Sequence, residues 1–154
     1  LSSMVREAVA LWSKGADLEV EIIDDAANAL VEIPRIAFSQ GFVNLLENAR
    51  QAQAEVDCLD RLELRVSRQR NDVVLTLRDH GCGLPDNPNQ VGEPFFTTKS
   101  NGTGLGVFVA RQVADQAGGG LAYHQGDGYT EVRLWVPESP RRANEPATPS
   151  TSGR

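Results

Sequence analysis

Three glycines at alternate positions, Gly102, Gly104 and Gly106, most constrain how this chain folds. They follow a polar and aromatic loop and precede an amphipathic helical pattern that ends in glycines at 118–120. Glycine lets a backbone approach an anion closely, and the free N–H groups of a first helical turn supply donors. Thr103 adds a hydroxyl at the predicted cap. The stretch indicates either a phosphate-binding helix start or plain turn chemistry.

The longest helical pattern runs over 35–54, after Pro34, a residue that suits a first helical turn. Its apolar stripe consists of Phe42, Leu45, Leu46, Ala49 and Ala52. Another face carries Asn44 and Asn48, one turn apart, although asparagine is a poor residue for a helix interior. Two interpretations stay open: a solvated face, or two side-chain carbonyls aimed at a ligand such as Mg²⁺.

Two strands are predicted over 62–68 and 73–78, joined as a hairpin. The second strand leads into Asp79, Gly81 and Gly83. An acid at a strand end can accept from an exocyclic amine, while the glycines let a flat ring lie against the backbone. A turn acid followed by turn glycines is the equal alternative.

The polar loop over 86–102 is longer than a simple connection, and its length is typical of a lid, a binding loop or a disordered segment. Phe95 and Phe96 either hook this loop onto a ligand or anchor it in the core, and packing is expected for at least one of them. Lys99 is either a point charge for a phosphate or a solvated side chain.

The remaining elements follow from apolar periodicity. A helix is predicted over 3–13 with Met4, Ala8, Leu11 and Trp12 on one side, and a strand over 18–23. A second short strand is predicted over 29–33, a helix from 104 or 105 to 117, and a final hairpin over 121–124 and 130–136. The helix stripe near the end comprises Leu105, Val109, Val113 and Ala117. A disordered tail is expected over 138–154.

Composition limits the partners. The formal charge of -6 disfavours nucleic acid and anionic membranes, which usually require a basic face. The two cysteines form no metal-ligand cluster with the histidines, which favours a reduced, cytoplasmic setting. No apolar run approaches the roughly 18 residues of a membrane span, so no direct membrane contact by this segment is expected. Because the chain begins at Leu1, we expect it to be a piece of a longer protein.

Taken together, these motifs resemble the asparagine box, first glycine box, phenylalanine box and second glycine box of the ATP-binding domain of sensor histidine kinases. That domain belongs to the ATPase group shared with gyrase B, Hsp90 and MutL. The resemblance covers roughly residues 18–136 and implies an α/β (α+β) two-layer sandwich, the Bergerat-type ATP-binding fold. In this fold a mixed, largely antiparallel sheet packs against about three helices. It also implies a linker helix over 1–16 and an ATP-binding catalytic domain over 17–137.

The resemblance also implies roles for individual residues. Asp79 is similar to the adenine-reading acid, Asn48 to the Mg²⁺ ligand, and Asn44 to a second side chain facing the phosphates and metal. Family members often carry a lysine and an aromatic residue where this chain has Gln51 and Ala52, and Arg50 or Lys99 is expected to substitute for that lysine. The catalytic candidates are Asn44, Asn48 and Lys99. The ATP-binding candidates are Asn44, Asn48, Arg50, Asp79, Gly81, Gly83, Leu84, Phe96, Thr97, Thr98, Lys99, Gly102, Thr103, Gly104, Leu105 and Gly106.

The function implied is binding of Mg-ATP and donation of the γ-phosphate to a histidine on a dimerisation helix, with a response regulator served indirectly. Neither His80 nor His124 has the sequence context of that acceptor histidine. Hydrolysing relatives carry a glutamate where this chain has Asn44, which favours transfer to a protein over ATP hydrolysis. The alternative is an anti-sigma-factor-type domain, an interaction protein that phosphorylates a serine on an antagonist.

Overall fold

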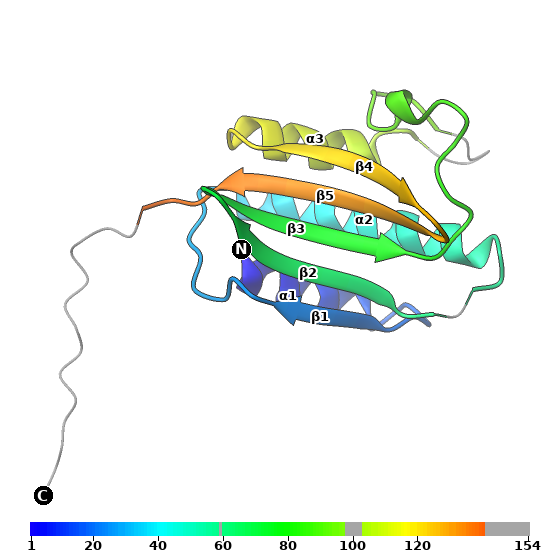
Figure 1. Cartoon of the computed structure of the whole chain (residues 1–154), viewed down its shortest axis with the longest axis horizontal. Helices are drawn as coiled ribbons and strands as arrows, with labels where there is room; N and C mark the ends of the chain where they lie inside the picture. Colours follow the sequence, from blue (N-terminus) through cyan, green and yellow to red (C-terminus); the bar gives the residue numbers. More distant parts are fainter. Residues whose placement is uncertain (59, 98–102, 141–154) are drawn as a thin grey trace, which may run out of the picture.

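The computed structural model describes residues 1–58, 60–97 and 103–140. In chain order the elements are α1 Ser2–Trp12, β1 Val20–Asp24, α2 Arg35–Ala54, β2 Leu62–Gln69, β3 Asp72–Asp79, the short 3-10 helix η1 Pro88–Gln90, α3 Gly106–Gln116, β4 Gly120–Gly126 and β5 Tyr129–Pro137. The strands form one sheet in the order β1-β2-β3-β5-β4 (Figure 1). Strands β1 and β2 are parallel, and every other neighbouring pair is antiparallel.

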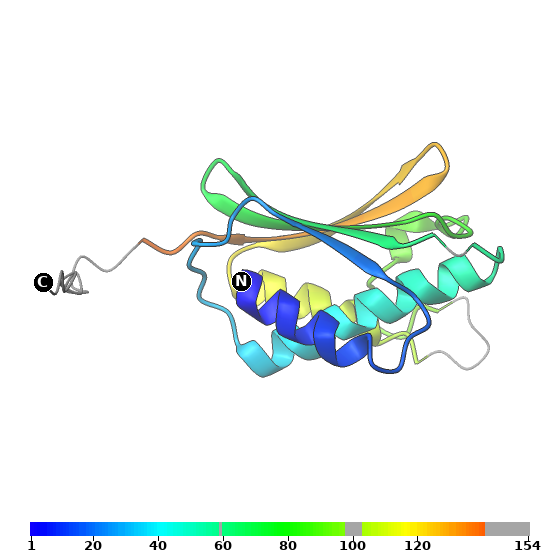
Figure 2. The ribbon, with the colours of Figure 1, turned by 90° about the horizontal axis from the view of Figure 1, so that it is seen from below.

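The molecule has two layers. All three α-helices lie on one face of the sheet (Figure 2), and no described element covers the other face. The strands alternate accordingly, with buried Leu62, Leu64 and Val66 on β2 facing the helices. From α2, Phe38 and Phe42 fill the space opposite and stack with ring centroids 5.8 Å apart. The predicted two-layer sandwich with a mixed sheet is confirmed.

Helices α2 and α3 approach each other closely because small residues lie at their crossing. A Cβ placed on Gly41 would lie 2.7 Å from the Cα of Ala110. Ala110 and Ala114 are buried in this contact, whereas the predicted stripe of α3 named larger side chains. Of that stripe, Val113 is buried, while Val109 packs only partly against the core. The close crossing places the start of α3 beside the middle of α2.

One sequence prediction is wrong and a second holds only in part. Residues 29–33 form no strand. Within the described part of the chain, this segment is joined to a distant one by the Ser139 N–H, which donates to the Leu30 carbonyl at 2.8 Å, and no ladder extends from that contact. The predicted apolar side of α1 holds in part, since Ala8 is buried and Met4 and Trp12 pack against the core. Leu11, however, is 64% exposed, and Val5 and Val9 are buried in addition.

The ordered body extends slightly past β5. The N–H of Glu138 donates to the Asn71 carbonyl at 2.8 Å, and its carboxylate pairs with Arg68 at 3.0 Å. Residues 141–154 lie outside the described part, so the tail there stays a prediction.

Candidate nucleotide site

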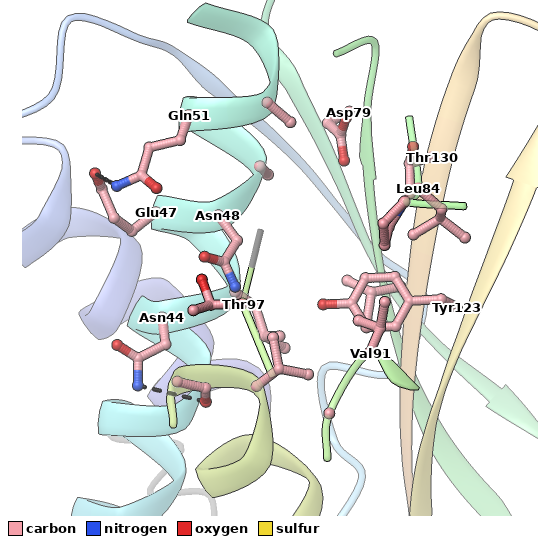
Figure 3. Close-up of a pocket in the computed structure, with 18 of the residues that line it drawn as sticks. Asn44, Glu47, Asn48, Gln51, Asp79, Leu84, Val91, Thr97, Tyr123 and Thr130 are labelled. Atoms are coloured by element: carbon pink, nitrogen blue, oxygen red, sulfur yellow. Dashed lines mark hydrogen bonds between the residues drawn. The ribbon is translucent and has the colours of Figure 1, made fainter. Parts of the chain in front are cut away.

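A cavity of about 560 Å³ opens between α2, the strands β3, β5 and β4, and the loop that leads to α3 (Figure 3). It lies within the volume range of small-molecule sites. The predicted candidates that line it share no single element and come from across the chain: Asn44, Asn48, Asp79, Gly83, Leu84, Phe96, Thr97, Thr103, Gly104 and Gly106. The fold therefore brings the separate sequence motifs to one place.

The α2 wall carries the two asparagines (Figure 3). Asn44 Nδ2 donates to the Gly106 carbonyl at 3.5 Å, at the start of α3. Because the amide nitrogen takes this contact, the amide oxygen is the atom left to face another group. Asn48 lies one turn further along α2 and also lines the cavity. Both side chains belong to a cavity wall, which favours the ligand interpretation over the solvated face.

Glu47 lies between the asparagines and is held by a local network. Its carboxylate accepts from Arg50 Nε at 3.0 Å, from Arg50 Nη2 at 2.6 Å and from Gln51 Nε2 at 2.7 Å. The Arg50 hydrogen bond is the main cause that lowers the pKa of Glu47. Arg50 is thus committed to Glu47 and is not among the residues lining the cavity. The structure does not support its predicted contact with a phosphate.

Asp79 ends β3 and points into the cavity (Figure 3). The residue is only 8% exposed. Burial raises the pKa of Asp79, although the Gly81 N–H, which donates to Oδ1 at 3.0 Å, and His80 both act to lower it. A half-satisfied, desolvated carboxylate at the bottom of a cavity is a strong acceptor for a ligand N–H group. This geometry favours the base-reading interpretation over the turn acid.

The two glycines after Asp79 have different structural reasons. A Cβ on Gly81 would lie 2.3 Å from the carbonyl carbon of Ala52, so Gly81 is where the loop touches the backbone of α2. Gly81 does not line the cavity, and its predicted contact with a flat ring is not supported. Gly83 adopts a φ of +85°, which favours glycine, and does line the cavity. The N–H of Leu84 is anchored by Gln125 Oε1 at 2.9 Å.

The loop before α3 forms the remaining wall. Phe96 is partly buried and lines the cavity, whereas Phe95 is 76% exposed, so packing applies to Phe96 alone. Gly104 has a φ of +66°, and its Cβ would lie 2.4 Å from the Phe95 carbonyl carbon. Leu105 precedes α3 without lining the cavity. Three further predicted contacts lie outside the described residues: Thr98, Lys99 and Gly102.

Helix α3 begins at the cavity, because both Gly106 and Val107 contribute to the lining. The N–H groups of a first helical turn have no partners within the helix and carry the positive end of its dipole. The cavity therefore has an acceptor at the Asp79 end and an anion-favouring helix start at the other. This polarity matches a ligand with an amine at one end and phosphates at the other.

Sequence reasoning missed the sheet side of the cavity. Tyr123 on β4, with Thr130 and Val132 on β5, lines this side. The alternation of side chains along β4 could have indicated this residue, because Tyr123 is two residues from buried Leu121 and so lies on the same face of the sheet. Another unpredicted lining residue, Val91, comes from a loop that carries no periodicity.

The donor set fits a cation carried by the ligand. Among the described residues, no group of three or more His, Cys, Asp or Glu side chains forms a metal cage. Mg²⁺ usually keeps few protein ligands and takes the rest from substrate phosphates and water. An amide oxygen from Asn48, beside Asn44, suits that mode.

Within the described part of the chain, no helix has the length and hydropathy to cross a membrane.

Comparison with known proteins agrees with this geometry. The family model "Histidine kinase-, DNA gyrase B-, and HSP90-like ATPase" matches residues 33–140. Nitrogen regulation protein NtrY of Azorhizobium caulinodans is 33% identical over 127 residues, which cover 79% of this chain and 16% of NtrY. Sensor protein FixL of Bradyrhizobium diazoefficiens is 29% identical over 143 residues, covering 89% of this chain and 28% of FixL. The chain thus spans well under a third of these relatives.

Solved structures match over nearly the whole fold. The catalytic domain of histidine kinase ThkA gives a TM-score of 0.77 at 23% identity, covering 90% of this chain and 92% of the ThkA chain. Mycobacterial sensor histidine kinase MprB also gives 0.77, at 21% identity, covering 90% and 96%. At these identities the likeness supports the fold.

Proposed function

Because this chain belongs to the histidine kinase-, DNA gyrase B-, and HSP90-like ATPase family, we propose that its cavity binds Mg-ATP and positions the γ-phosphate for transfer to a histidine of the same kinase. The family match and the sensor-kinase relatives identify the chain as an ATP-binding catalytic domain of a protein-histidine kinase. The residue roles, the metal and the acceptor are our proposal. The relatives favour histidine over the serine acceptor of an anti-sigma-factor-type kinase.

The observation that carries the proposal is a polar cavity with a buried acid at one end and a helix start at the other. Asp79 accepts a hydrogen bond from the exocyclic amine of adenine, an interaction that its burial strengthens. The first turn of α3, preceded by Gly104, meets the phosphates with backbone donors. The ligand therefore lies along α2, from Asp79 toward Asn44.

Asn48 would hold Mg²⁺ through its amide oxygen, with Asn44 beside it. When bound, Mg²⁺ would supply positive charge that neutralises the charge developing on the phosphates. The chain's own residues would orient the terminal phosphate toward the acceptor. This orientation would be the main source of catalysis.

The site is poorly equipped to activate water. Glu47 is the carboxylate nearest in sequence to the proposed metal ligand, but Arg50 and Gln51 bind it and lower its pKa. A carboxylate stabilised in its charged form is a weak general base. We therefore expect slow ATP hydrolysis by this chain alone and phosphoryl transfer when a histidine-bearing dimerisation segment is supplied. In the whole protein, a response regulator would receive the phosphoryl group from that histidine.

Calorimetric titration with a non-hydrolysable ATP analogue, with and without Mg²⁺, tests the proposal. We expect binding that Mg²⁺ strengthens and that exceeds binding of the matching GTP analogue. Asn48→Ala should remove the Mg²⁺ dependence. Asn28→Ala, at an exposed turn outside the cavity, is the matched control and should bind like the unmodified chain. Equal affinity of the two variants with Mg²⁺ present would contradict the assignment of Asn48.

A further inference from the structure

One side chain that lines the cavity, Tyr123, carries a hydroxyl to which the proposed function assigns no role. Tyr123 lies on β4, and Figure 3 shows its ring extending from the sheet with the hydroxyl pointing toward α2, into the space between. Among the described residues, this hydroxyl has no hydrogen-bond partner, since none of the cavity contacts involves it. Tyrosine hydroxyls in enclosed positions usually find a partner. An unpartnered one aimed into a cavity indicates a ligand.

The sheet register fixes where this hydroxyl lies relative to Asp79. Asp79 pairs with Thr130 across β3 and β5, and Thr130 pairs with Gln125 across β5 and β4. Tyr123 is two residues along β4 from Gln125 and therefore projects from the same face. Strand spacing and rise place the Cα atoms of Asp79 and Tyr123 about 12 Å apart. Both side chains therefore line the same cavity from neighbouring parts of one sheet face.

The chemistry of the hydroxyl is that of a donor. Burial, followed by the charge of Asp79, raises the pKa of Tyr123, and Arg111 opposes this only in part. The phenol is therefore neutral over the physiological range and has an O–H to give. A base held at Asp79 by its exocyclic amine presents ring nitrogens, which are acceptors. Donor and acceptor are thus complementary.

We propose that the Tyr123 hydroxyl donates a hydrogen bond to a ring nitrogen of the adenine base and so helps select the nucleotide. This inference rests on the proposed function, because it assigns a further residue to the same site. It differs from a packing role, in which the ring alone matters and the hydroxyl is dispensable. Tyr123→Phe separates the two, since it removes one oxygen and keeps the ring.

The experiment is titration of the whole chain with ADP, comparing the unmodified protein, Tyr123→Phe and a matched control. Tyr129→Phe is the control, because Tyr129 lies under Arg78 outside the cavity and undergoes the same chemical change. We expect Tyr123→Phe to raise the Kd for ADP by about 3- to 10-fold, the range for one hydrogen bond. Tyr129→Phe should leave the Kd unchanged. An unchanged or lower Kd in Tyr123→Phe would overturn the proposal.

Deaza analogues identify the accepting atom. ADP analogues that lack N1, N3 or N7 are titrated against the unmodified chain and Tyr123→Phe. With the analogue that lacks the accepting nitrogen, the two proteins should bind equally, because the hydrogen bond is already absent. The same penalty with ADP and all three analogues would place the contact on the sugar or phosphates and overturn the assignment to the base. Failure of the unmodified chain to bind ADP would instead contradict the proposed function.

Discussion

A substitution at Gly81 tests whether this position is glycine to admit the ligand or to let the loop after Asp79 pack against α2. The family resemblance suggests that this glycine admits the base, whereas the structure places it against α2. A Cβ at this position would lie 2.3 Å from the carbonyl carbon, 2.6 Å from the carbonyl oxygen and 2.6 Å from the Cβ of Ala52. Two of these atoms are backbone of a helix and cannot move independently. Gly81→Ala must therefore displace the loop from α2.

The magnitude follows from two losses. Forcing an extra carbon into a packed contact costs about 1–3 kcal/mol. The displacement also breaks the hydrogen bond from the Cys82 N–H to the Ala52 carbonyl, which measures 3.0 Å, and one such bond contributes about 1 kcal/mol. We therefore expect Gly81→Ala to lower the free energy of unfolding by about 2–4 kcal/mol without any nucleotide present.

Urea denaturation of the nucleotide-free chain, followed by circular dichroism, measures this change. Gly15→Ala is the matched control, because a Cβ there meets nothing within 4 Å, and its stability should stay within about 0.5 kcal/mol of the unmodified chain. If Gly81→Ala unfolded at the same urea concentration and lost only nucleotide binding, the reasoning would be refuted. Gly81 would then serve approach of the ligand rather than packing of the loop.

The remaining predictions concern two buried carboxylates. Asp79→Asn should weaken adenine-nucleotide binding at least 10-fold yet raise the nucleotide-free stability at pH 7. The raised pKa of Asp79 means that its ionisation opposes folding as pH rises above the ordinary value of 3.8; lower stability by urea titration would contradict this. Glu131 is buried but accepts from Arg78 and Arg133, and these hydrogen bonds outweigh burial and lower its pKa. Its contribution is present above about pH 4.5 and lost as pH falls through the folded pKa. Glu131→Gln should cost about 2 kcal/mol at pH 7 and little at pH 2, whereas a constant difference would argue against the ion pair.

The sequence predicted most of the fold because periodicity is a local property. The helix over 35–54 is observed with those bounds, and the central hairpin differs by one residue at most ends. Prediction failed where a segment's partner decides its conformation. Residues 29–33 have strand-like composition, but within the described residues the Ser139 N–H bonds the Leu30 carbonyl there and no ladder forms.

The candidate site divides in the same way. Asn48, Asp79 and Gly104 were predicted to share a site because motif order and spacing are written in the chain, and all three line the cavity. Arg50 was predicted to contact a phosphate, but in the structure it binds Glu47, nearly one helical turn away, and does not line the cavity. Spacing alone does not say which of two acceptors an arginine binds.

By itself, the sequence determined the order of elements, the residue types of the site and the family. Only the tertiary structure decided which of those residues share a cavity. It placed Gly81 against helix α2 and put Tyr123 of the last hairpin on the same face of the sheet as Asp79, with β5 between them. The physical reason is that the sequence specifies the chemical groups of the side chains, whereas sheet register and helix crossing decide which of those side chains lie next to one another. Both depend on contacts between residues far apart in the chain.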